Sequence, residues 1–146
     1  MLSIQAKQRI IDRITTAGVE KASECFEECL KFLSLCAENP GRAFVPSLSV
    51  DQAWHEFILC TKEYTQHCSS FGSYVHHDPT DGPDLDAYEQ TRQALVEKHG
   101  EINETVWPPV KAGSCTGSCE SGKCKTLFAV GSCTGSCESG KCKTIF

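Results

Sequence analysis

Apolar residues recur at three- and four-residue steps over most of the first 100 positions. This spacing places them along one face of an α-helix, and no alternating strand pattern competes with it. Glycine and proline positions such as Gly18, Asn39-Pro40-Gly41 and Gly100 supply the stop signals. The pattern predicts helices over residues 4–16, 19–36, 49–68 and 84–99. The predicted fold class is therefore all-α, a small four-helix array.

The same pattern predicts helix caps and inward-facing side chains. Ser49-Val50-Asp51-Gln52 fits a capping box, so Ser49 is the expected N-cap of the third helix. Cysteine packs as a small hydrophobe, and the cysteines of the second helix are expected in the core. The inward-facing residues predicted for the first and last helices are Ile4, Ile11, Ile14, Leu85, Tyr88, Leu95 and Val96.

A proline-containing segment separates the helical region from a different kind of sequence. Trp107-Pro108-Pro109-Val110 cannot continue a helix, because proline lacks the backbone N–H and restricts the residue before it. The predicted organisation is a helical domain, a linker and a cysteine-rich tail, at residues 1–107, 108–112 and 113–146.

The tail is a duplicated unit. Residues 113–128 and 131–146 are identical except that Leu127 is replaced by Ile145. Each unit has too few apolar residues to offset the entropy lost on ordering, so the tail is expected to be largely disordered by itself.

Charge and cysteine content narrow the function classes. A net charge of -5 and a pI near 5.5 disfavour nucleic acid and anionic membranes as partners. The N-terminus becomes polar before a signal peptide could form and no apolar run would cross a bilayer, so we expect a cytoplasmic protein. In a reducing compartment, 11 cysteines in 146 residues indicate metal binding or redox chemistry rather than static disulfides.

Each tail unit carries three thiols on a Gly/Ser-rich chain. Such thiols can close around one soft ion, and trigonal Cu(I) or four-coordinate Zn(II) would fit. A flexible linker, a reversible disulfide element and the substrate part of a modified-peptide precursor are alternative interpretations. The six candidate ligands are Cys115, Cys119, Cys124, Cys133, Cys137 and Cys142.

A second candidate site lies in the helical domain. Asp51 and His55 are four residues apart on the third predicted helix, and His76 and His77 follow in the loop after it. Adjacent residues of an extended segment point to opposite sides, so only one of the two loop histidines is expected to join His55 at a metal. Cys68 could complete a mixed site. The alternative is a structural His55, hydrogen-bonded to Asp51 or to a loop carbonyl.

The residues of this second candidate site belong to a longer sequence pattern, and that pattern resembles a known family. Asp-x-x-Trp-His, followed by Tyr, Cys, Phe-Gly and His-His, resembles glycine-rich domain-containing-like proteins over about 30 residues, from Pro46 to Pro79. The long glycine-rich region of the plant members has no counterpart here. The resemblance implies that domain and tail form one functional unit. The motif positions that it implies are Asp51, Trp54, His55, Tyr64, Cys68 and His76 or His77.

The expected function is metal binding, with copper or zinc as the ion and buffering or transfer as the purpose. A metal-accepting protein or a modifying enzyme would be the macromolecular partner. The competing class is a metal-dependent redox enzyme that acts on thiols or on a cysteine-containing peptide, including its own tail. No Gly-x-Ser-x-Gly or phosphate-loop motif is present in the sequence, and His55 is not followed by a second histidine at the zincin position. An interaction protein whose tail is only a tether is the third class.

Overall fold

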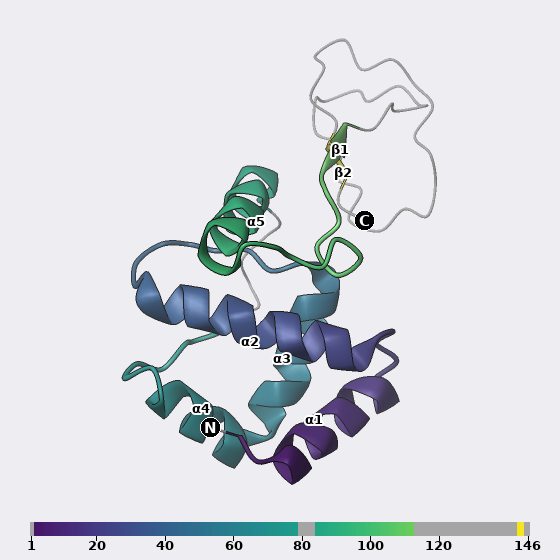
Figure 1. The fold of residues 1–146 in the computed structure, drawn as a ribbon, viewed down its shortest axis with the longest axis vertical. Coiled ribbons are helices and arrows are strands. Elements are labelled where there is room, and N and C mark those ends of the chain that lie inside the picture. The colour runs from purple at the N-terminus through teal and green to yellow at the C-terminus, as the bar shows by residue number, and fades with distance from the viewer. Residues whose placement is uncertain (1, 79–83, 113–142, 145–146) are drawn as a thin grey trace.

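A computed structural model describes residues 2–78, 84–112 and 143–144 of the chain (Figure 1). The all-α class is confirmed, but the described residues form five helices where four were predicted. A two-residue antiparallel pair joins Lys111 to Thr144 and Ala112 to Lys143. The elements are α1 (Ile4–Thr16), α2 (Ala22–Glu38), α3 (Leu48–Leu59), α4 (Thr61–Ser69), α5 (Leu85–His99), β1 (Lys111–Ala112) and β2 (Lys143–Thr144).

The extra helix arises because the predicted third helix breaks at Cys60. This residue has φ -84° and ψ 62°, and its N–H bonds to the carbonyl of Phe57 only three residues back. Neither glycine nor proline marks the break, and the apolar spacing continues through it into Tyr64. The turn redirects the chain so that α4 buries Tyr64 and Cys68.

Helix α2 forms the centre of the domain. In Figure 1 it crosses the middle of the view, with α1 and α4 below it and α5 above it. Its buried side includes Phe26, whose ring meets Phe57 of α3 edge-on at 5.2 Å, and Phe32, whose ring lies 5.4 Å from Trp54. Cys25 and Cys29 are buried there, as predicted. The core therefore fixes α3, the helix that carries Asp51 and His55, against α2.

Three of the predictions for caps and faces are wrong. The N-cap of α3 is Ser47 rather than Ser49, because the Ser47 hydroxyl accepts the N–H of Val50. Ile4 is 87% exposed, since α1 buries the row Ala6, Ile10 and Ile14 instead. Val96 is 41% exposed because Leu95, one helical position away, takes the inward place on α5.

The segment after α5 returns to the core. Trp107 is fully buried and donates its indole N–H to Glu28 of α2 at 2.9 Å. Tyr88 donates its hydroxyl to the carbonyl of Pro108, and the N–H of Val110 bonds to Glu89. The first residues of the predicted linker therefore contact α5, and the predicted division at residue 107 stays a prediction.

The six tail cysteines lie outside the described residues. The prediction that the tail is disordered also concerns residues outside the described ranges. Within the described part of the chain, no helix has the length and apolar character needed to cross a membrane.

Candidate metal centre

Asp51 and His55 form the helical half of the site. They are one turn apart on α3, so their side chains lie on the same face, and Asp51 falls in the first turn of the helix. The helix dipole favours a negative charge at that end. The Nε2 atom of His55 lies 3.7 Å from Oδ2 of Asp51. The helix thus supplies a carboxylate and an imidazole that are already close together.

The loop after α4 supplies the third side chain. His77 places its Nε2 2.6 Å from Oδ1 of Asp51, and its ring centroid lies 4.5 Å from that of His55. One donor atom from each of the three residues lies within 4.8 Å of the other two. The side chain of His77 is 11% exposed, that of Asp51 29% and that of His55 48%. The group therefore opens to solvent on the His55 side.

The spacing of these donors fits one ion after a small adjustment. Zinc binds imidazole nitrogen and carboxylate oxygen at about 2.0–2.2 Å, which puts two tetrahedral donors about 3.3–3.6 Å apart. The 2.6 Å separation of His77 from Oδ1 of Asp51 is shorter than that value, and the 3.7 Å separation of His55 from Oδ2 is longer. The side chains would therefore have to move to bind one ion through a single Asp51 oxygen. Without a metal the close contact between Asp51 and His77 is a hydrogen bond, which holds these two side chains together, whereas His55 at 3.7 Å lies beyond hydrogen-bond distance from Asp51.

Aromatic and hydroxyl groups surround His77 and the backbone just before it. The indole ring of Trp54 lies 4.3 Å from the imidazole of His77, centroid to centroid. The indole N–H of Trp54 donates to the hydroxyl of Tyr64 at 3.0 Å, and that hydroxyl donates to the carbonyl of Val75 at 2.5 Å. The loop is thereby attached to both α3 and α4.

The other predicted domain ligands lie elsewhere. His76 is exposed, and its ring is 4.8 Å from that of Tyr74. Cys68 is buried beside Tyr64, where it contributes to raising the tyrosine pKa after the larger effect of burial. Neither residue belongs to the group around Asp51. Among the described residues the structure therefore brings together two nitrogen donors and one oxygen donor.

The remaining domain thiols are poor ligand candidates. Burial raises the pKa of Cys25, Cys29 and Cys60, and it raises the pKa of Cys36 to about 12. Metals bind the thiolate form, which these environments disfavour. Of the three α2 cysteines predicted to be buried, Cys25 and Cys29 are core residues, whereas Cys36 is only partly buried and packs against the core.

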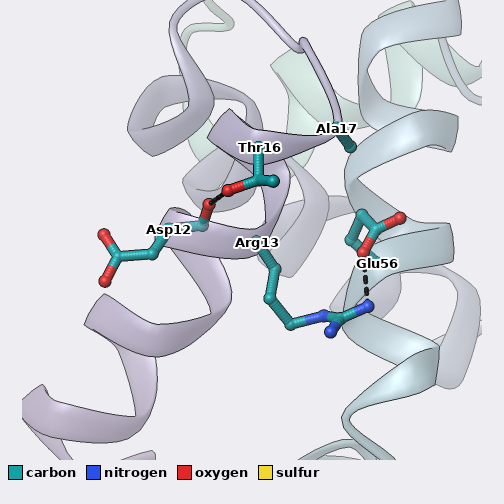
Figure 2. Close-up of a pocket in the computed structure, with 5 residues that line it drawn as sticks. All are labelled: Asp12, Arg13, Thr16, Ala17 and Glu56. Carbon is teal, nitrogen blue, oxygen red and sulfur yellow. Dashed lines mark hydrogen bonds and ion pairs between the residues drawn. The ribbon is translucent and has the colours of Figure 1, made fainter.

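A second surface feature, which the sequence did not predict, lies between α1 and α3 (Figure 2). It is a hollow of about 410 Å³ lined by Asp12, Arg13, Thr16, Ala17 and Glu56. Arg13 pairs with Glu56 at 2.8 Å across it, and the Asp12 carboxylate points away from that pair. Because the guanidinium is already matched by a carboxylate, the hollow lacks the unmatched charge of an anion site.

The fold and the site define an all-α domain with a histidine–aspartate cluster between its third helix and the loop after its fourth. The chain belongs to the UCP032817-like family, whose match covers residues 1–98. That range includes all three members of the cluster and excludes Trp107 and the duplicated tail. No curated protein matches the chain, and no solved structure does.

Proposed function

We propose that this protein binds transition-metal ions, and that its helical domain holds one divalent ion through Asp51, His55 and His77. The observation that carries the proposal is the convergence of three donor atoms from two separate elements within 4.8 Å. Imidazole with carboxylate suits borderline divalent ions such as Zn(II), whereas Cu(I) prefers sulfur. The domain is therefore assigned a borderline divalent ion, and zinc is the ion used in the test below.

The tail thiols form the second part of the proposal. Three cysteines per unit would bind soft ions, Cu(I) or Zn(II), for buffering or for transfer to an accepting protein in the cytoplasm. This part rests on sequence alone, since Cys115 to Cys142 lie outside the described residues. The kinship with glycine-rich domain-containing-like proteins, which would make domain and tail one unit, stays a prediction as well.

One observation favours a metalloenzyme as the alternative. Catalytic zinc sites use three protein ligands and keep a further position for water or substrate, whereas structural sites close all four. The described cluster offers three donors, and His55 leaves it half open to solvent. A thiol substrate, including a cysteine of the tail, would then bind directly to the metal.

The decisive experiment uses a full-length parent in which the tail cannot bind metal. All six tail cysteines are replaced by serine, and zinc stoichiometry and affinity are measured by native mass spectrometry and chelator competition. We expect one equivalent of zinc, lost in His77→Ala and in His55→Ala. His76→Ala is the matched control, because His76 is adjacent in sequence yet exposed and outside the cluster.

Each part of the proposal has its own negative result. If His77→Ala retains zinc, or if His76→Ala loses it equally, the domain site as described is wrong. If the wild-type chain binds no more metal under reducing conditions than the serine-substituted parent, the tail is not a metal site.

A further inference from the structure

We infer that Tyr64 and Trp54 are positioning residues that hold His77 at the metal centre. The inference rests on the proposed function, because it concerns the same site. Three observations support it: the hydrogen bonds of one buried hydroxyl, the alternation of exposure along the loop, and the contact between the indole and imidazole rings.

The hydroxyl of Tyr64 joins three parts of the chain. It accepts a hydrogen bond from Trp54 of α3, it belongs to α4, and it donates to the backbone of Val75 in the loop. Tyr64 is 1% exposed and Trp54 5%. Water therefore has little access to replace these bonds, and losing the hydroxyl would leave the Trp54 N–H and the Val75 carbonyl without this partner.

The bond to Val75 determines which loop histidine faces the site. Val75 is buried, His76 exposed and His77 mostly buried, which is the alternation of an extended segment. Anchoring Val75 inward thus turns His77 inward two residues later and His76 outward. A loop free to shift by one residue would exchange the two histidines.

The indole ring then restricts the orientation of the imidazole. Trp54 and His77 have ring centroids 4.3 Å apart at an interplanar angle of 56°. On the other side, Asp51 accepts the hydrogen bond of Nε2. The ring of His77 is therefore oriented before any metal arrives. Such supporting groups typically change metal affinity by about 10- to 100-fold.

The test compares two buried tyrosines, of which only Tyr64 is attached to the loop that carries His77. Tyr88 is also fully buried and donates its hydroxyl to a backbone carbonyl, that of Pro108 at 2.8 Å, but it lies on α5 against Trp107. Tyr64→Phe and Tyr88→Phe are made in the parent with serine-substituted tail. Zinc affinity is measured by chelator competition, and stability by urea unfolding of the metal-free protein.

We expect both variants to lose stability, Tyr64→Phe more than Tyr88→Phe because its hydroxyl has two protein partners. Only Tyr64→Phe should lose zinc affinity, by about 10- to 100-fold. Affinity within about threefold of the parent in Tyr64→Phe, or an equal loss in Tyr88→Phe, would overturn the inference. His77→Ala is measured beside these variants, so that failure of the metal site itself can be told apart from failure of the inference. The site itself fails if the parent binds no zinc, or if His77→Ala still binds it.

A second variant covers the case in which Tyr64→Phe does not fold. Trp54→Phe keeps an aromatic ring in the core but removes the N–H that donates to Tyr64, and it leaves the Tyr64 to Val75 bond in place. Weaker zinc binding, with the long-range ¹H–¹⁵N signals of His77 shifted and those of His99 unchanged, is the expected result. Unaltered affinity and unaltered His77 signals would contradict the inference.

Discussion

Replacing Trp107 tests whether the segment after α5 is part of the folded domain. The side chain is fully buried, its ring lies 6.0 Å from both Phe32 and Tyr88, and its N–H bonds to Glu28. Glu28 is itself only 4% exposed, and its second carboxylate oxygen pairs with Lys31 at 2.7 Å. Trp107 thus fills the space between α2 and α5 and supplies a donor to a buried carboxylate.

Two substitutions separate these contributions. Trp107→Ala leaves a cavity and should lower the free energy of unfolding by about 3–5 kcal/mol. Trp107→Phe keeps most of the apolar contact but removes the hydrogen bond to a charged group, and we expect a loss of about 2 kcal/mol. The loss stays moderate because Lys31 still pairs with Glu28.

Urea unfolding followed by circular dichroism at equilibrium is the assay, since it does not depend on tryptophan fluorescence. The alanine variant should shift the midpoint by more than about 1 M urea. Val96→Ala, on an exposed position of α5, is the control and should change stability by about 0.5 kcal/mol or less. A loss under about 1 kcal/mol in Trp107→Ala would refute the packing described here.

A chain ending at Val110 should accordingly stay folded, and one ending at Thr105 should resemble Trp107→Ala or be less stable.

Three further predictions concern acid stability, helix capping and thiol reactivity. Burial, together with nearby positive charge, lowers the pKa of His67 in the folded protein. As the pH drops below about 6.5, the unfolded chain therefore binds a proton at His67 more readily than the folded protein does, and the free energy of unfolding should fall. His67→Phe should flatten this dependence in urea midpoints measured between about pH 5 and 7, and an unchanged slope would contradict the assignment. Ser47→Ala should cost about 1 kcal/mol in the same assay and Ser49→Ala clearly less, because Ser47 caps α3; the reverse order would restore the cap predicted from sequence. In the parent with serine-substituted tail, a disulfide reagent at neutral pH should modify Cys36 and Cys60 slowly, because burial raises the pKa of both thiols. Rapid labelling would contradict this prediction and show that the two thiols are accessible thiolates.

Much of the helical framework could be predicted because its signals are local. The predicted limits of the first helix, residues 4–16, are those of α1, where the Ser3 hydroxyl caps the start and Gly18 follows the end with φ 85°. The break at Cys60 was missed because it has no local signal. Neither glycine nor proline marks it, and the turn is favoured by the burial of Tyr64 on the far side.

The candidate site also has one part that could be predicted from local sequence and one part that could not. The Asp51 and His55 pair followed from one helical turn of spacing, and the expectation that a single loop histidine joins them agrees with the cluster. The choice of His77 over His76 could not be made from sequence, because it depends on where the loop is anchored. That anchor is a hydrogen bond from Tyr64 to Val75, eleven residues apart and beyond a helix end.

The division of the motif between a helix and a loop has an evolutionary consequence. Asp51, Trp54 and His55 lie within one unbroken helix, so a single inserted or deleted residue among them would rotate one member by about 100° relative to the others and move it away from His77. Insertions between α4 and Tyr74 would only lengthen a connection whose far end is attached by Val75. Family members should therefore keep the three-residue and one-residue steps of Asp-x-x-Trp-His without gaps, while their alignments accumulate length differences before the histidine of the loop.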